Sequence, residues 1–555
     1  MKRLADRPNL DHLKKQAKDL LALYKSGNPA AIARFRNALP AASDKDDMGI
    51  ANLALRLHDA QSCVAREYGF PSWPDLKSYV EARAAHNGDR TPSSLEWLRL
   101  VYAADIAGGA NRARPHAVAR MLEEGAAAAH DDPYLACAIG EEAVLRQVTE
   151  GDPGWVDRAG GPLNLPPLVA VTHSSLLRLP EFRDRLHKSA RLLLDAGADP
   201  NQAVGSRWPP DSVSKPSEVF PLSALYGAAG QNHDAELTKL LLDAGADPND
   251  GESLYHSLEN LECTRRLLQA GARIIGTNTL YRVLDLDDID GLRLLLSWGA
   301  DPNEPASSSP TSDWGSPLLW AIRRRRSLAH IEALLEAGAD PSARTPDGAS
   351  AHTLALRFGL PHVAQRLAQT GNVEQVAEEE RFIAACTRVD ETLARRMLAQ
   401  RADLVGALTE TQLRLLPELA AQGCDEAVRL MVELGWPIAM PGGDWNASAL
   451  NHAVFRGDAA LTRFLLEHGA SWKERHGHGD NACGTLGWAS CNEPVEGGDW
   501  LGCAQALVAH GMPSAQPDPE GSDSVLVDGR RKWFSDEVTD YLLRGHTTHA
   551  AASSP

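Results

Sequence analysis

The chain contains 555 residues, of which 43% are hydrophobic, and its formal net charge at pH 7 is −18. This acidity argues against nucleic acid as the main partner, because binding to phosphates requires dense lysine and arginine. The eight cysteines include no C-x-x-C pair, a pattern typical of a reducing compartment. No signal peptide opens the sequence, and no run of about 18 apolar residues would span a membrane. We therefore expect a cytoplasmic protein without a membrane segment.

Residues 1–86 carry three predicted helices. The first is amphipathic, since apolar residues recur at helical spacing from Leu10 to Tyr24. A second helix is expected from about Ile50 to Glu67, and an aromatic turn over residues 68–73 leads into a third. We interpret this segment as a hydrophobic cap for a following helical array, because the ends of such arrays need covering. A separate binding module is the alternative. The polar stretch Asn87–Ser93 is the expected boundary.

A phrase repeats along the rest of the chain. It reads "RLLLDAGADPN" at Arg191–Asn201 and "KLLLDAGADPND" from Lys239. The leucines are typical of the last turns of a helix, and the glycine that follows suits the left-handed backbone at a helix end. Asp and Pro then favour a turn. The phrase therefore predicts a helix that ends and a chain that turns outward.

Degraded copies of the phrase occur at about 35-residue intervals, close to the 33 residues of an ankyrin unit. The further positions of the glycine are Gly125, Gly151, Gly271, Gly299, Gly338, Gly371, Gly435, Gly469 and Gly511, and Arg401 stands at one such position. Segments upstream, such as "GSPLLWAI" (Gly315–Ile322) and "SALNHAVFRGD" (Ser448–Asp458), are similar to the T-P-L-H-x-A-A opening of ankyrin repeats. The chain thus resembles a bacterial ankyrin-repeat protein with an N-terminal helical leader.

This resemblance implies an all-α fold, an α-solenoid of about 11–13 divergent repeats, each a helix-turn-helix with a short β-hairpin finger. The solenoid is expected over residues 94–545, and the polar end 546–555 is expected to be a disordered tail. Repeat boundaries stay open in 95–160 and 372–435. Insertions mostly share one phase, between the phrase and the next inner helix, so they would lengthen the fingers: Gln202–Val219, Glu304–Asp313, Arg475–Cys483 and Ser514–Arg531. They indicate either a shaped groove or neutral drift in loops.

Candidate binding residues follow from the expected concave face, where Trp, His and Arg are typical of recognition. Packing between helices is the alternative for each of them. The set comprises inner-helix positions and finger residues, namely His256, Arg282, Trp320, Arg323, Asp444, Trp445, His452, Arg456, His478 and Trp488.

Two finer hypotheses concern chemistry. His476, His478, Asp480, Cys483 and Cys491 are residue types that bind zinc, but their spacing matches no familiar site. Fingers of successive repeats lie side by side, so Asp444 and His478 are candidates for an acid–base pair. No catalytic motif stands out, and we assign no catalytic residue, cofactor or metal.

The basic run Arg323–Arg326 is either a solvated helix end, where its charge suits the helix dipole, or a docking site for an acidic partner or an anionic ligand. For the whole protein we favour a scaffold that binds a partner protein through its concave groove and elongated fingers. The alternative is a small-molecule enzyme or ligand receptor with a site across repeats near 250–330 or 440–500. A closed pocket with buried titratable groups would favour the second.

Overall fold

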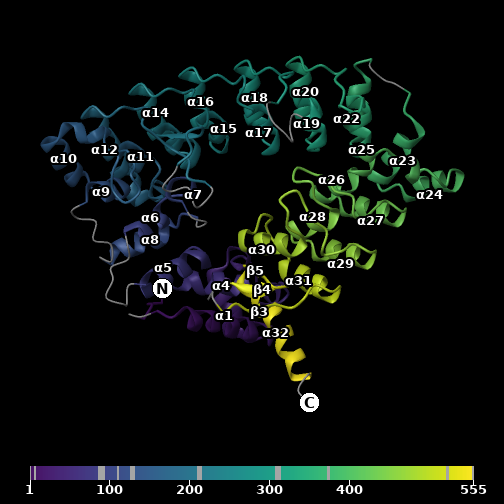
Figure 1. The fold of residues 1–555 in the computed structure, drawn as a ribbon, viewed down its shortest axis with the longest axis horizontal. Coiled ribbons are helices and arrows are strands. Elements are labelled where there is room, and N and C mark those ends of the chain that lie inside the picture. Colours follow the sequence, from purple (N-terminus) through teal and green to yellow (C-terminus); the bar gives the residue numbers. More distant parts are fainter. Residues whose placement is uncertain are drawn as a thin grey trace. The chain divides into compact units, whose positions relative to one another are not determined.

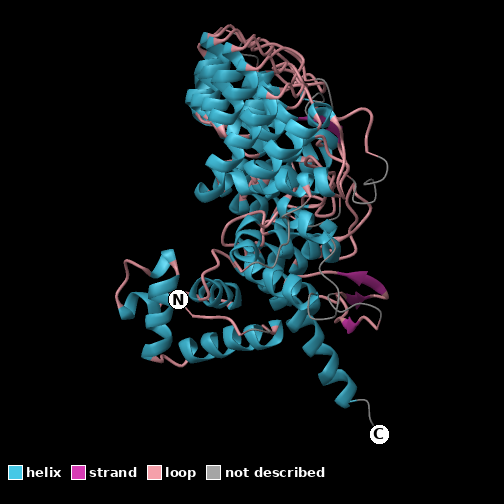
Figure 2. Ribbon diagram, turned by 90° about the vertical axis from the view of Figure 1, so that its left-hand side faces the viewer, coloured by secondary structure: helices cyan, strands magenta, loops and turns pink. Residues whose placement is uncertain are grey.

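The computed structural model describes residues 2–5, 8–85, 94–108, 112–124, 132–208, 216–306, 314–371, 375–519 and 524–552. These residues divide into two compact units, Met1–Thr279 and Leu280–Pro555. Both units are mostly helical, and strands are confined to short pieces (Figure 2). The all-α prediction is therefore confirmed.

The first unit opens with helices that the sequence predicted only in part. They are α1 (Leu10–Lys25), α2 (Pro29–Ala38), α3 (Asp47–Ala51), α4 (Leu57–Glu67) and α5 (Trp73–Ala85). Helix α2 was not predicted, although Asn28 caps it and Pro29 occupies its first turn, which is a strong start signal. The single helix expected over 50–67 is wrong, because the chain leaves the helical conformation after Ala51 and α4 begins only at Leu57.

Three helices follow the predicted boundary Asn87–Ser93, which lies outside the described residues. They are α6 (Ser94–Val101), α7 (Ala104–Ala107) and α8 (Pro115–Glu123). Helix α5 packs against α8, and the hydroxyl of Tyr79 donates a 2.5 Å hydrogen bond to Glu124, directly after α8. The N-terminal helices are therefore joined to the array by direct packing.

The rest of the first unit is a stack of helix pairs. Its helices are α9 (Pro133–Ile139), α10 (Glu142–Gly151), α11 (Pro167–Thr172), α12 (Pro180–Asp195), α13 (Ala224–Tyr226), α14 (Ala235–Asp243), α15 (Ser253–His256) and α16 (Leu261–Gln269). The odd-numbered helices pack on one another in chain order and form an inner layer. The even-numbered helices do the same and form an outer layer (Figure 1).

The second unit continues with pairs of the same kind. Its helices are α17 (Thr279–Asp285), α18 (Ile289–Ser297), α19 (Pro317–Arg323), α20 (Leu328–Glu336), α21 (Ala351–Arg357), α22 (Pro361–Ala368), α23 (Glu378–Thr387), α24 (Glu391–Gln400), α25 (Glu410–Leu413), α26 (Leu415–Ala421), α27 (Asp425–Glu433), α28 (Ala449–Phe455), α29 (Ala459–Glu467), α30 (Ala482–Asn492), α31 (Trp500–Ala509) and α32 (Asp536–Ala552). Inner helices α26, α28 and α30 pack in succession, as do outer helices α27, α29 and α31.

The repeated phrase ends the outer helices as predicted. A glycine with positive φ follows the helix at nine of the predicted positions, which are Gly197, Gly245, Gly271, Gly299, Gly338, Gly371, Gly435, Gly469 and Gly511. Gly151 is an exception because it is the last residue of α10, and Arg401 has an extended backbone instead. Gly125 lies outside the described residues.

The asparagine of the phrase bonds each pair to the next. Asn201 Oδ1 accepts from the backbone N–H of Asp247 at 2.8 Å, and the equivalent Asn249 accepts from Arg273 at 2.9 Å. Asn303 makes both possible bonds, since it accepts from Asp340 N at 2.7 Å and donates to Gly338 O at 2.9 Å. We call these contacts the asparagine bridge.

Inner helices also end in the left-handed conformation. In the second unit the residue two positions after the helix has positive φ at Asp287, Arg325, Gly359, Val389, Gly423 and Gly457. Glycine serves at three of these positions because it has no Cβ to clash. Five of these six pairs therefore contain two left-handed corners, one after each helix, whereas α23–α24 has only the first because Arg401 is extended.

The strands lie where fingers were expected. Strands β1 (Ala203–Gly205) and β2 (Pro221–Ser223) are antiparallel, with Val204 opposite Leu222. Isolated bridges join Arg344 to Ser350 and Arg475 to Asn481. Strands β3 (Gln516–Pro517), β4 (Val525–Val527) and β5 (Arg530–Lys532) form one antiparallel sheet.

At the C-terminal end, α32 continues to Ala552, whereas the sequence predicted a disordered tail over 546–555; residues 553–555 lie outside the described part. None of the helices in the described ranges is both long and apolar enough to cross a membrane.

Candidate binding site

Most of the predicted site residues fall on neighbouring elements of the second unit. Arg282 is half-buried on α17, and His256 belongs to the first unit at the end of α15. The others lie on α19, α28, α30 and the loops before or after them, and they are Trp320, Arg323, Asp444, Trp445, His452, Arg456, His478 and Trp488. Most candidate residues chosen from the predicted register of the inner helices therefore lie on neighbouring elements, although they are far apart in the chain.

Arg323 is the centre of a buried ion-pair cluster. Its side chain is 1% exposed, and it donates to Glu418 of α26 at 2.9 Å and lies 2.8 Å from Asp444. The guanidinium also lies over the rings of Trp314 and Trp320, at 4.5 and 4.9 Å from their centroids. A buried charge requires partners of this kind, since an unpaired one is very costly. Arg323 therefore ties α19 to α26 across more than ninety residues of sequence.

Arg324, the residue that follows α19, extends the cluster. It forms ion pairs of 2.7 Å with Asp285 of α17 and Asp444 of the finger before α28. Trp320 is fully buried beneath it, and its indole N–H donates to Asp285 at 3.0 Å. We expected Trp320 to face an open groove, but its ring is covered by these charged groups. In this conformation it offers no surface to a partner.

Neighbouring charges and burial shift the pKa values of Asp444 and His452. Burial by itself would raise the pKa of Asp444, but Arg323 and Arg324 hold it below its ordinary value. His452, which is 2% exposed, has a lowered pKa because burial disfavours the imidazolium. Its Nε2 lies 3.1 Å from the Gly442 carbonyl, which indicates that this nitrogen carries the proton of the neutral ring. Asp444 is thus held as an anion and His452 as a neutral ring.

The expected acid–base pair of Asp444 and His478 takes a different form. Asp444 is engaged by two arginines, as described above, whereas the ring of His478 stacks on Trp445 with centroids 6.5 Å apart. The zinc hypothesis finds no support in geometry either, since no group of three potential ligands is close enough within the described residues.

Aromatic side chains form a row beside the cluster. Trp445 contacts Phe455 at 5.7 Å, and Phe455 stacks on Trp488 at 5.4 Å with an interplanar angle of only 8°. His476 packs against the edge of Trp445 at 5.0 Å. Trp488 is 52% exposed, so the row ends in an open indole face. We call Trp445, Phe455 and Trp488 the aromatic row.

The register of inner helices α28 and α30 brings the residues of the aromatic row together. Ser448 caps α28 and Asn481 caps α30, so both helices start in register at the base of their fingers. Helices α28 and α30 pack side by side (Figure 1). Phe455 at the end of α28 therefore meets Trp488 on α30, a contact that the sequence analysis did not predict.

In the first unit His256 joins a different group. Its ring contacts Tyr226 at 5.3 Å and Tyr255 at 4.9 Å, and its Nε2 lies 3.3 Å from Glu252. His173, which directly follows inner helix α11, is buried and bonds Gln231 at 2.7 Å. Burial lowers the pKa of His173, although Asp105 opposes this. His173 was not predicted, because it falls one position after the end of a short inner helix.

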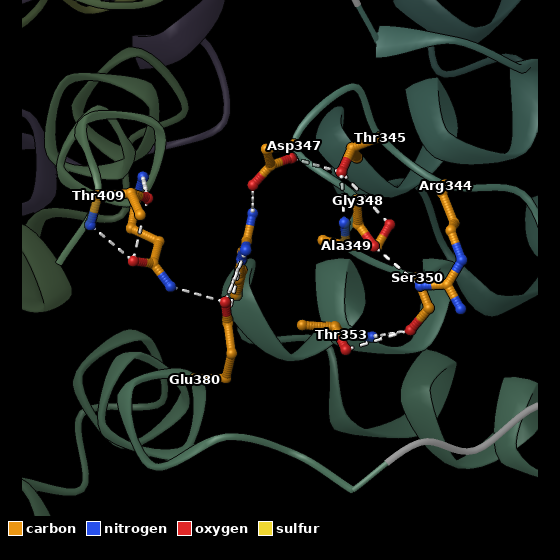
Figure 3. A network of polar contacts seen from close by, with 11 residues as sticks. Arg344, Thr345, Asp347, Gly348, Ala349, Ser350, Thr353, Glu380 and Thr409 are labelled. Carbon is orange, nitrogen blue, oxygen red and sulfur yellow. Dashed lines mark hydrogen bonds and ion pairs between the residues drawn. The ribbon is translucent and has the colours of Figure 1, made fainter.

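A second buried network was also missed. Arg357 at the end of α21 donates to Glu380 of α23 at 2.6 Å and pairs with Asp347 of the preceding finger at 2.8 Å. Gln412 donates to Glu380 at 2.8 Å, and its own oxygen accepts from the N–H of Thr409 (Figure 3). Every charged group in this network has a partner, which is typical of polar contacts that hold neighbouring repeats together. The spacing of Arg357 and Glu380 along the chain carries no signal that would have revealed it.

Comparison with protein-family models finds no match to this chain, and comparison with curated proteins finds none that is similar to it.

Proposed function

We propose that this protein is an ankyrin-like solenoid that binds a partner protein through the inner side and fingers of its second unit. The periodic phrase, the two layers of stacked helices and the finger-like turns support this architecture. Each is what an ankyrin array requires, since a repeat buries its apolar face only against its neighbours.

The observation that carries the binding proposal is the aromatic row. An indole that is 52% exposed and stacks on a second aromatic ring is held in one orientation before a partner arrives. Such rigid aromatic anchors, beside arginine, are the residues that dominate binding energy at protein interfaces. The partner is therefore expected to place an apolar side chain on Trp488.

The test replaces Trp488 with alanine. Truncating an interface anchor commonly costs about 2 kcal/mol or more, so the affinity for the partner should fall roughly thirtyfold or more. Affinity capture from a native lysate with quantitative mass spectrometry identifies proteins held by the wild type, and calorimetry with the purified partner gives the dissociation constant.

Trp298→Ala provides the matched control. Trp298 is exposed to a similar extent, at 46%, but it follows outer helix α18. Its replacement should leave capture unchanged. The proposal fails if Trp488→Ala, shown to be folded by circular dichroism, retains every captured protein at wild-type affinity.

A further inference from the structure

A cavity of about 580 Å³ lies in the second unit, where the ends of several inner helices meet. Its lining is dominated by guanidinium groups, contributed by Arg324, Arg325 and Arg326 after α19 and by Arg456 after α28. Gln422, after α26, and Asp285 complete the polar lining. Four arginines against one aspartate is a strong local excess of positive charge in a chain whose net charge is −18.

Two of the arginines are neutralised by the protein. Arg324 pairs with Asp285 and Asp444, as described above. Arg326 pairs with Asp287 at 2.8 Å and also donates to the carbonyl of Arg324 at 2.9 Å. The role of Arg326 is therefore structural, since a cation that bonds a helix-terminal carbonyl stabilises the helix end.

Arg325 and Arg456 are different. Among the described residues no carboxylate forms an ion pair with either of them. Arg325 Nη1 contacts the sulfur of Cys424, a thiol whose pKa burial raises, so the contact leaves the positive charge uncompensated. Arg456 Nε is buried and has no hydrogen-bond partner within the described ranges. Its guanidinium packs on Gly423, where an added Cβ would lie 2.4 Å from Nη1.

The backbone at Arg325 gives a second, independent observation. Its φ is +55°, at a corner where Gly359, Gly423 and Gly457 stand in other pairs. A side chain in this conformation is strained, and strain of this kind is typical of functional positions. Glycine avoids this strain at three of the six corners, whereas Asp287 and Val389 share it with Arg325, and what distinguishes Arg325 is that its guanidinium lines the cavity.

We propose that this cavity binds a small molecule through a phosphate group, with Arg325 and Arg456 as its principal ligands. Arginine matches the planar pairs of oxygens on such a group and carries its charge at every pH of interest. A doubly charged oxyanion matches these two guanidiniums, neither of which forms an ion pair with a carboxylate of the described residues, although Asp425 lies near enough to Arg456 to interact with its charge. The cavity is much larger than phosphate alone, and Gln422 Oε1, buried without a donor among the described residues, is available to accept from a hydroxyl of the ligand.

This inference is independent of partner binding at the aromatic row, and Arg325→Gly tests it without disturbing the fold. The replacement restores the residue found at equivalent corners, so its thermal stability should equal or exceed that of the wild type. Calorimetric titration of the full chain with inorganic phosphate, at constant ionic strength, should show saturable binding by the wild type and at least tenfold weaker binding by the variant. Arg456→Gln should weaken binding to a similar extent.

Two controls separate the site from general effects of charge and backbone. Arg395→Gln removes the same charge from the exposed face of α24, and Val389→Gly makes the same backbone change away from the cavity lining. Both should bind phosphate as the wild type does. Acetate should bind the wild type at least tenfold more weakly than phosphate. The proposal is overturned if phosphate binding is absent, if Arg325→Gly and Arg456→Gln bind it as tightly as the wild type, or if acetate competes equally.

Discussion

Two carboxyl groups meet where the neighbouring outer helices α27 and α29 begin. Burial, together with a hydrogen bond to Asp458 and repulsion from it, raises the pKa of Asp425 to about 6, while Arg456 and Arg429 act in the opposite direction. Asp458 is the cap of α29 and accepts from the N–H of Leu461 at 2.8 Å. The capping role explains why position 458 is acidic. The charge of Asp458 in turn disfavours the ionised form of Asp425.

This pair predicts a pH-dependent effect of Asp425→Asn. Because the folded-state pKa exceeds the unfolded value of about 3.9, the folded protein binds the extra proton, and Asp425 disfavours folding increasingly as pH rises from about 4 to 6. The variant should gain roughly 1 kcal/mol over the wild type above pH 6, after allowance for solvent screening, and little at pH 4. Urea unfolding at pH 4 to 7 measures the difference.

Asp290→Asn, in the exposed first turn of α18, is the control and should show no such trend. A difference between Asp425→Asn and the wild type that is the same at pH 4 and pH 7 would contradict the assignment.

The sequence placed several candidate residues on inner helices, but it predicted neither their burial nor the contacts that they make. The inner-helix register placed Trp320, His452 and Trp488 on one side, because equivalent positions of equivalent repeats share a direction. It could not reveal that Arg323 reaches Glu418, since such a contact depends on how far the stack bends between residues 323 and 418. Trp320 is covered for this reason and Trp488 is not.

At the scale of elements, the asparagine bridge explains why the phrase ends as it does. Leucine, glycine and proline serve the helix end and the turn, whereas Asn303 bonds both a donor and an acceptor of the following phrase. Each bridge fixes the distance from one outer turn to the next. Hydrogen bonds along its edge therefore help to fix the register of the stack, in addition to the apolar packing within its layers.

Asn303→Ala should lower the free energy of unfolding by about 1 kcal/mol, because two hydrogen bonds between pairs are lost at a partly hydrated edge. Urea unfolding provides the measurement. Ser342→Ala is the matched control, since Ser342 occupies the same place in the next phrase but bonds Asp340 of its own turn. Equal stability losses in the two variants would show that the bridge contributes nothing of its own.

Outer helices were the most predictable elements, because a leucine run and a glycine mark each end. Helix α2 was missed because it is short and most of its apolar residues are alanines, which leave its clearest signal in its cap, Asn28 followed by Pro29. Three of the left-handed corners after inner helices of the second unit carry Asp287, Arg325 and Val389. Aspartate tolerates a left-handed backbone, but arginine and valine do not favour it, so the corners at Arg325 and Val389 could not be predicted.

At the scale of the whole molecule, the N-terminal helices are continuous with the first stack. Leu76, Tyr79 and Val80 of α5 are buried, as are Val118 and Met121 of α8, the helix against which α5 packs. This arrangement favours the interpretation of residues 1–86 as a cap rather than as a separate module.

Deleting residues 1–86 should therefore expose the apolar face of α8. We expect the truncated protein to aggregate or to melt at least about 5 °C lower in differential scanning calorimetry, through the loss of several kcal/mol of packing. Glu124→Gln, which weakens the polar contacts of Glu124 with Tyr79, Arg83 and Arg120 but removes no apolar packing, should melt close to the wild type. A truncated chain that stays monodisperse with unchanged melting would show that the leader is an independent module.

The asparagine bridges also bear on how this chain tolerates added sequence. The long segments that follow Asn201 and Asn303 begin after the asparagine that forms the bridge to the next phrase. A loop that starts there adds length without altering the spacing of the turns on either side, and the entropic cost of lengthening it grows only slowly. Added sequence in these segments therefore leaves the register of the stack unchanged, and repeats of this kind can diversify their fingers while the stack that carries them stays the same.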